Sequence, residues 1–87
     1  MPRAFIPPLL KPLTAGEEIV EVNGNNVRRV IDELENRFPG IREKLCEQDE
    51  LKPGLTVAVD GNISSLGLLQ KVGDDSEVHF LPAIGGG

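Results

Sequence analysis

One stripe of apolar residues between positions 27 and 38 constrains the fold of this chain more than any other feature. Its members fall at i, i+3, i+4, i+7 and i+11, and they are Val27, Val30, Ile31, Leu34 and Phe38. This spacing predicts an amphipathic helix over residues 27–38, with Asn25 or Asn26 capping its first turn and Pro39-Gly40 ending it. On its charged face, spacing of i,i+4 predicts three weak ion pairs, Arg28–Asp32, Arg29–Glu33 and Glu33–Arg37.

Short runs rich in β-branched residues surround this helix. Strands are predicted over residues 4–6, 17–22, 55–59 and 77–81, the first two forming an antiparallel hairpin. Alternation places Val78 and Phe80 inward in the last strand, and His79 outward. Residues 41–46 are predicted to add one or two helical turns, residues 47–50 an acidic loop, and residues 63–72 a short strand or irregular segment.

A single amphipathic helix must bury its stripe against a sheet, which predicts an α+β domain of two layers. With 87 residues, one domain is expected. The order of elements matches a ubiquitin-like β-grasp: a mixed sheet of four or five strands packed on one main helix. In that topology the first and last strands run parallel, side by side, in the middle of the sheet. The expected domain covers residues 1–82.

The net charge of −5 disfavours binding to nucleic acid and to anionic membranes. Cys46 is the only cysteine, so no internal disulfide can form and a reducing compartment is expected. Prolines at positions 7, 8 and 12 interrupt the apolar stretch near the start, which is therefore neither a signal peptide nor a membrane span. These features predict a cytoplasmic protein.

The last five residues, Ala83-Ile84-Gly85-Gly86-Gly87, are expected to form a flexible tail over residues 83–87. Glycine has no Cβ, so the tail can pass through a channel that is too narrow for side chains. A terminal α-carboxylate is ionised at neutral pH and can attack the α-phosphate of ATP in a partner's active site. The apolar residues leading into the tail, Phe80, Leu81, Pro82, Ala83 and Ile84, are either a cap on the core or a docking patch for that partner.

The sequence offers no other group suited to catalysis. Cys46 has acidic neighbours, which raise the pKa of a thiol, so we interpret it as structural. His79 is the only histidine and has no clustered cysteines, so a surface role is expected and no metal site. The adjacent acids Glu17–Glu18 and Asp74–Asp75 are interpreted as solvated charges, and we predict that the chain is not an enzyme.

Several blocks resemble the MoaD/ThiS-type sulfur carriers in the right order along nearly the whole chain. They include residues 27–35 and 37–45, the strand and turn Val57-Ala58-Val59-Asp60-Gly61, and residues 73–78. The most specific is the ending Leu81-Pro82-Ala83-Ile84-Gly85-Gly86-Gly87, which is similar to the family's Pro-Ala-Val-Ala-Gly-Gly. Residues 60–65 depart from the family, being shorter and less charged than its usual loop. The opening block, residues 5–16, resembles the carriers that serve a cysteine synthase.

The resemblance implies a carrier cycle centred on Gly87, with Gly85 and Gly86 as the rest of the conjugation tail. A ubiquitin-activating-type adenylating enzyme would use ATP and Mg to activate the carboxylate, and the carrier itself would bind no cofactor. A sulfurtransferase or cysteine desulfurase would then supply the sulfur of a thiocarboxylate. The acceptor would be a cysteine synthase, or else a molybdopterin synthase large subunit or thiazole synthase. Because Gly87 closes this sequence, no proteolysis is expected to be needed.

Two other functions remain open from the residues alone. The same tail could join the chain to lysines of target proteins, as a ubiquitin-like protein modifier. Alternatively, the chain could be a passive β-grasp binding module whose tail is incidental.

Overall fold

The computed structural model of this protein describes residues 1–82, and residues 83–87 lie outside the described part. Seven strands are present among the described residues: β1 (Arg3–Phe5), β2 (Ile19–Glu21), β3 (Cys46–Glu47), β4 (Glu50–Leu51), β5 (Leu55–Val59), β6 (Asn62–Ile63) and β7 (Glu77–Pro82). The helices are α1 (Val27–Arg37), α2 (Ile41–Leu45) and two 3-10 helices, η1 (Pro8–Thr14) and η2 (Gly67–Leu69).

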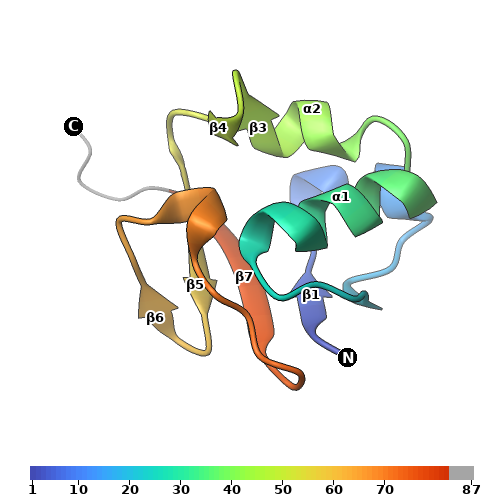
Figure 1. Ribbon diagram of the computed structural model, residues 1–87. Coiled ribbons are helices and arrows are strands. Elements are labelled where there is room, and N and C mark those ends of the chain that lie inside the picture. The colour runs from blue at the N-terminus through green and yellow to red at the C-terminus, as the bar shows by residue number, and fades with distance from the viewer. Residues whose placement is uncertain (83–87) are drawn as a thin grey trace.

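Five strands form one mixed sheet in the order β2-β1-β7-β5-β6. The last strand, β7, is central, with β1 parallel on one side and β5 antiparallel on the other. β2 extends the sheet as the antiparallel partner of β1, and α1 crosses one face of the sheet (Figure 1). The predicted ubiquitin-like β-grasp, with first and last strands parallel and adjacent, is confirmed.

The core lies between α1 and the sheet. From the helix, the predicted stripe buries Val27, Val30, Ile31 and Leu34, while Phe38 packs at the margin. From the sheet, alternate residues of each strand point to the same side, and they include Ala4, Val20, Val57, Val59, Val78 and Phe80. Full burial of one aliphatic side chain stabilises the fold by about 1.5–3 kcal/mol, so this aliphatic layer holds helix and sheet together.

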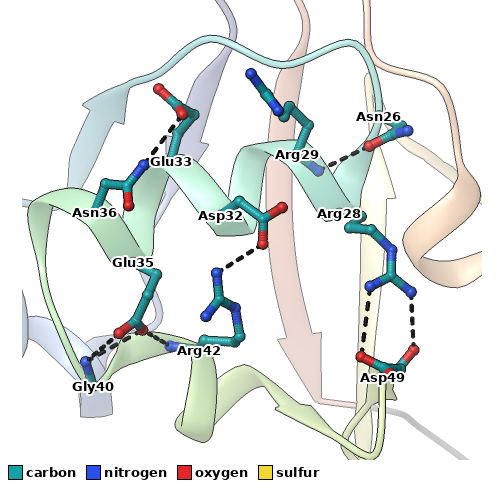
Figure 2. Close-up of polar contacts among 10 residues, drawn as sticks. All are labelled: Asn26, Arg28, Arg29, Asp32, Glu33, Glu35, Asn36, Gly40, Arg42 and Asp49. Atoms are coloured by element: carbon teal, nitrogen blue, oxygen red, sulfur yellow. Dashed lines mark hydrogen bonds and ion pairs between the residues drawn. The ribbon is translucent and has the colours of Figure 1, made fainter.

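Side chains define where both α-helices begin. The Oδ1 of Asn26 accepts a 2.8 Å hydrogen bond from the backbone N–H of Arg29, which confirms the predicted cap of α1. The carboxylate of Glu35, on α1, accepts backbone N–H groups from Gly40 at 3.1 Å and Arg42 at 2.8 Å (Figure 2). Hydrogen bonds from the backbone of Arg42 and then Gly40 lower the pKa of Glu35. One helix therefore caps the next, an arrangement that the sequence did not reveal.

The three predicted ion pairs along α1 are wrong. Arg28, Asp32 and Arg37 contact neighbouring elements, and Glu33 accepts a 3.4 Å hydrogen bond from Asn36 on α1 itself. The guanidinium of Arg28 lies 3.6 Å from the carboxylate of Asp49 in the β3–β4 turn, and the carboxylate of Asp32 accepts a 2.8 Å hydrogen bond from Arg42 (Figure 2). Arg37 donates to the backbone carbonyl of Glu21 at 2.9 Å. An arginine that contacts another element gives up little stability, since an ion pair with a residue four positions along the helix contributes only about 0.2–0.5 kcal/mol.

Two connections contain elements that the sequence patterns did not predict. Residues 8–14 form the 3-10 helix η1, and the first turn of a helix tolerates the proline with which it begins. Residues 46–51, of which 47–50 were expected to be a loop, form the small hairpin β3–β4. Its turn residues Gln48 and Asp49 have φ of 52° and 63°. Neither residue is the glycine that usually announces this left-handed turn, so the sequence pattern did not reveal the hairpin.

Candidate functional site

The end of β7 carries the residues that lead into the tail, and the sheet holds this strand on both sides. Its first three residues pair with β1 through Arg3↔Glu77, Ala4↔Val78 and Phe5↔His79. Its residues 78–82 pair with β5, from Val59↔Val78 to the last pair, Leu55↔Pro82. The backbone is therefore fixed as far as Pro82, and the chain leaves the sheet from its central strand.

The residues predicted to form the docking patch divide between the two faces of β7. Phe80 is 4% exposed and belongs to the core. Leu81 is 37% exposed on the opposite face, and Pro82 is also exposed. The aromatic ring of Phe80 therefore anchors the strand, and within the described part of the predicted patch only Leu81 and Pro82 offer side chains to a partner. Ala83, Ile84, Gly85, Gly86 and Gly87 lie outside the described residues, so the tail and its modified residue stay predictions.

A carboxylate at the β5–β6 turn fixes the beginning of β7. Asp60 accepts hydrogen bonds from the Ser76 hydroxyl at 2.7 Å and from the backbone N–H of Glu77 at 2.9 Å. The same Ser76 oxygen accepts the backbone N–H of Gly73 at 2.8 Å, which closes the turn before β7. These bonds, with the Ser76 hydroxyl first, lower the pKa of Asp60.

The outer face of the sheet, away from α1, carries an apolar row that the sequence analysis missed. The rings of Phe5 and His79 stack with centroids 4.0 Å apart and 12° between their planes. Cross-strand pairing places Ile19 beside Phe5, and Ala58 beside both His79 and Ile63. The sequence predicted that His79 points outward, but not its neighbours. Those neighbours are set by the strand registers, which depend on pairing between segments far apart in the chain.

Neither Cys46 nor His79 has the surroundings of a catalytic group. Burial raises the pKa of the half-buried Cys46 thiol, although Arg42 and Arg28 act against this, so the thiol is the weak nucleophile expected of a structural cysteine. The His79 ring lies between Phe5 and the carboxylate of Glu77, whose Oε1 is 3.3 Å from Nε2. Within residues 1–82, no three His, Cys, Asp or Glu side chains gather closely enough to hold a metal ion. The described helices are also all too short or too polar to cross a membrane.

A family comparison decides what kind of β-grasp protein this is. Residues 6–87 match the ThiS family, a match that includes the end of β7 and continues through Gly87. This chain belongs to the ThiS family. The resemblance inferred from the sequence blocks is thereby confirmed.

Curated relatives of this ThiS-family chain are sulfur carriers. It is 34% identical to the sulfur carrier protein CysO of Mycobacterium tuberculosis, and the match covers 94% of each chain. It is 31% identical to the molybdopterin synthase sulfur carrier subunit of the same species, over 85% of this chain and 78% of that one.

Solved structures agree with the family assignment. A chain of the Amycolatopsis orientalis BexX/CysO complex superimposes with a TM-score of 0.90 at 32% identity, covering all of both chains. Mycobacterium tuberculosis CysO superimposes with a TM-score of 0.88 at 29% identity, covering 97% of this chain and 100% of that one. SAMP1 of Haloferax volcanii, at 20% identity and a TM-score of 0.71, shares the fold.

Proposed function

We propose that this chain is a sulfur carrier protein for cysteine biosynthesis, and that the carboxylate of Gly87 is the group that carries the sulfur. One observation carries the proposal: the match to the ThiS family extends through Gly87, beyond a β-grasp body whose central strand leads directly to the tail. The CysO relatives, named as sulfur carriers and matched over nearly their whole length, support the same function.

The body suits this role because it gives the tail a fixed base. β7 is hydrogen-bonded within the sheet as far as Pro82, and five residues follow it. An extended segment of five residues spans no more than about 17 Å. The partner's reactive centre therefore has to lie within that distance of the surface on which the body docks, and Leu81 and Pro82 lie at the start of the span.

The chemistry follows from an acyl terminus without a side chain. In the adenylating partner, a Gly87 carboxylate oxygen attacks the α-phosphorus of Mg-ATP, pyrophosphate leaves, and an acyl-adenylate forms. A persulfide sulfur then attacks the acyl carbon and AMP leaves, giving an acyl disulfide. A thiol cleaves its S–S bond, is itself oxidised to a disulfide, and leaves the thiocarboxylate. The chain is a substrate throughout, and ATP and Mg belong to the partner, which supplies positioning and electrostatic stabilisation.

The acceptor that we propose is a cysteine synthase-type enzyme. The CysO relatives are matched over 94% of their length, whereas the molybdopterin synthase subunit is matched over 78% of its length. The opening block, residues 5–16, independently resembles the cysteine synthase-linked carriers. The protein-modifier alternative is not favoured, because the SAMP1 structures are only 20–21% identical and share the fold alone.

Mass spectrometry of the intact protein tests the proposal. The chain is incubated with the adenylating enzyme of the same organism, Mg-ATP, a persulfide donor and a thiol. We expect a mass gain equal to replacing one oxygen by sulfur, and fragment ions that place it on Gly87. A variant lacking Gly86 and Gly87, which no longer ends in two glycines, supplies the matched control and should gain nothing. An unchanged mass for the wild-type chain, or a ladder of lysine conjugates in its place, would contradict the proposal.

A further inference from the structure

A groove on the edge of the molecule exposes two leucines that the carrier cycle does not use. It lies between β4 and η2, which contact each other, and has a volume of about 400 Å³. Four leucines are among the residues that line it: Leu51, Leu66, the buried Leu68 and Leu69. Leu66 is 57% exposed and Leu69 is 66% exposed.

A tight turn holds the two exposed leucines at the groove. The backbone N–H of Leu69 donates to the carbonyl of Leu66 at 3.0 Å, an i→i+3 bond. Both leucines line the same groove. Gly67 makes the turn at a φ of 55°, which glycine adopts without strain. Single exposed leucines are ordinary, but a pair that lines one groove is typical of an interaction site.

The charged residues that line the groove are Glu50, Asp49 and Arg28, so its rim carries more acid than base. Glu47 is not among the lining residues but faces Glu50 across the β3–β4 hairpin, and like charges directly opposite destabilise a strand pair. Among residues 1–82, no basic side chain lies within 4.0 Å of either carboxylate, whereas Asp49 is paired with Arg28 (Figure 2). The groove therefore suits a large apolar side chain carried on a segment with lysine or arginine beside it.

The groove also lies close to the point where the chain leaves the sheet. Leu51 ends β4, and the chain enters β5 four residues later at Leu55, which pairs with Pro82. Figure 1 shows the connection from β4 running directly into β5. A partner seated in the groove is thus within reach of both Leu81 and the tail.

We propose that this groove receives an apolar side chain of the adenylating enzyme, presented on a basic segment. The inference rests on the proposed function and adds a docking surface separate from β7. An enzyme that holds Mg-ATP beside Gly87 needs a positive surface near the tail, which matches the acidic rim and favours the adenylating enzyme over the acceptor.

ATP–pyrophosphate exchange by the adenylating enzyme of the same organism, measured against carrier concentration, tests this surface. For the double variant Leu66→Ser/Leu69→Ser we expect the half-saturating concentration to rise by at least about tenfold, as for the loss of central interface anchors, with the maximal rate unchanged. Leu9→Ser is the matched control, since Leu9 is 92% exposed on η1, outside the groove, and should leave both parameters unchanged.

A charge reversal keeps the test independent of any effect of the serines on folding. Glu47→Lys/Glu50→Lys should also raise the half-saturating concentration, and should weaken the dependence of binding on salt. Circular dichroism melting curves confirm that each variant is folded. If both double variants behave like Leu9→Ser while the wild type is active, the groove inference is overturned and the proposed function stands. A loss seen only in transfer to the acceptor synthase also overturns it. No exchange with the wild type overturns both proposals.

Discussion

The hydroxyl of Ser76 donates a 2.7 Å hydrogen bond to the carboxylate of Asp60, joining residues sixteen positions apart in the chain. The link ties the β5–β6 turn to the residue before β7, the strand that leads into the tail. The backbone N–H of Asp60 also donates to the carbonyl of Glu77 at 2.9 Å, so the two segments exchange bonds in both directions. The side chain of Asp60, in the β5–β6 turn, therefore holds the start of β7 in place.

The stability contributed by Asp60 should depend on pH. Hydrogen bonds from Ser76 and Glu77 lower the pKa of Asp60 from its ordinary value of 3.8. A depressed pKa means that this contribution is complete above about 3.8 and disappears as pH falls through the lower folded-state pKa. We expect Asp60→Asn to be less stable than the wild type at pH 6, and the difference to shrink below pH 4. Urea unfolding of both proteins between about pH 2 and pH 7 measures it.

Substitution of Asp74 by Asn is the control for that experiment, since no hydrogen bond or ion pair of its carboxylate is present among residues 1–82 and the change should leave the free energy of unfolding nearly unchanged. A stability difference for Asp60→Asn that stays constant across the whole pH range would mean that the carboxylate charge is unimportant.

Neighbouring substitutions at the end of β7 should separate packing from docking. Phe80→Ala empties a buried site and should lower the free energy of unfolding by about 3–5 kcal/mol. Leu81→Ser changes a side chain that is 37% exposed and should cost less than about 1 kcal/mol. It should instead raise the carrier concentration needed by the adenylating enzyme. Chemical denaturation measures the stability of both variants, and ATP–pyrophosphate exchange measures their binding to the adenylating enzyme. Equal stability losses would show that Phe80 and Leu81 do not differ in their contribution to packing.

Removal of the α1 cap should weaken the helix measurably. Asn26→Ala deletes the acceptor for the backbone N–H of Arg29 and should lower the free energy of unfolding by about 0.5–2 kcal/mol. Asn26→Asp keeps an acceptor and should recover most of the loss. Asn25→Ala is the neighbouring control, because the polar contact shown for Asn25 uses its backbone carbonyl, which bonds Val72. If Asn25→Ala were as costly as Asn26→Ala in urea melts, the cap would not be the cause.

Two glycines at positive φ should respond differently to alanine. A Cβ on Gly24 would lie 2.9 Å from Cγ2 and from the backbone nitrogen of Val30, whereas a Cβ on Gly16 would meet nothing within 4 Å. Gly16→Ala carries only the backbone strain of a left-handed residue, about 1–2 kcal/mol. Gly24→Ala adds steric overlap with the buried start of α1 and should cost clearly more. Thermal melts compare the stabilities of the two variants. A larger loss for Gly16→Ala than for Gly24→Ala would show that the backbone around Gly24 moves to accommodate the added Cβ.

Periodicity was enough to predict the elements that pack against each other. The stripe from Val27 to Phe38 predicted α1, and alternation around Val78 and Phe80 predicted the inward face of β7. These patterns are readable because burial of one face leaves its period in the sequence. The tail and Gly87 were identified from their composition and from the family resemblance, and their role remains a prediction.

Pairings between distant residues could not be predicted in the same way. The arginines Arg28 and Arg37 reach Asp49 and Glu21 because those groups lie beside α1 in space, although not along it. Alternation predicted that Phe80 is buried, and the structure confirms it, so Phe80 lies outside the surface that β7 offers to a partner.

What the amino-acid sequence determined by itself was the fold, the family and the expected reactive end, because hydrophobic period and terminal composition are local properties. Tertiary structure alone decided which side chains remain on the surface for partners. The outer row around Phe5 and His79 and the groove at Leu66 and Leu69 arise from strand register and element packing. Both depend on contacts between segments far apart in the chain, and local patterns do not encode those contacts.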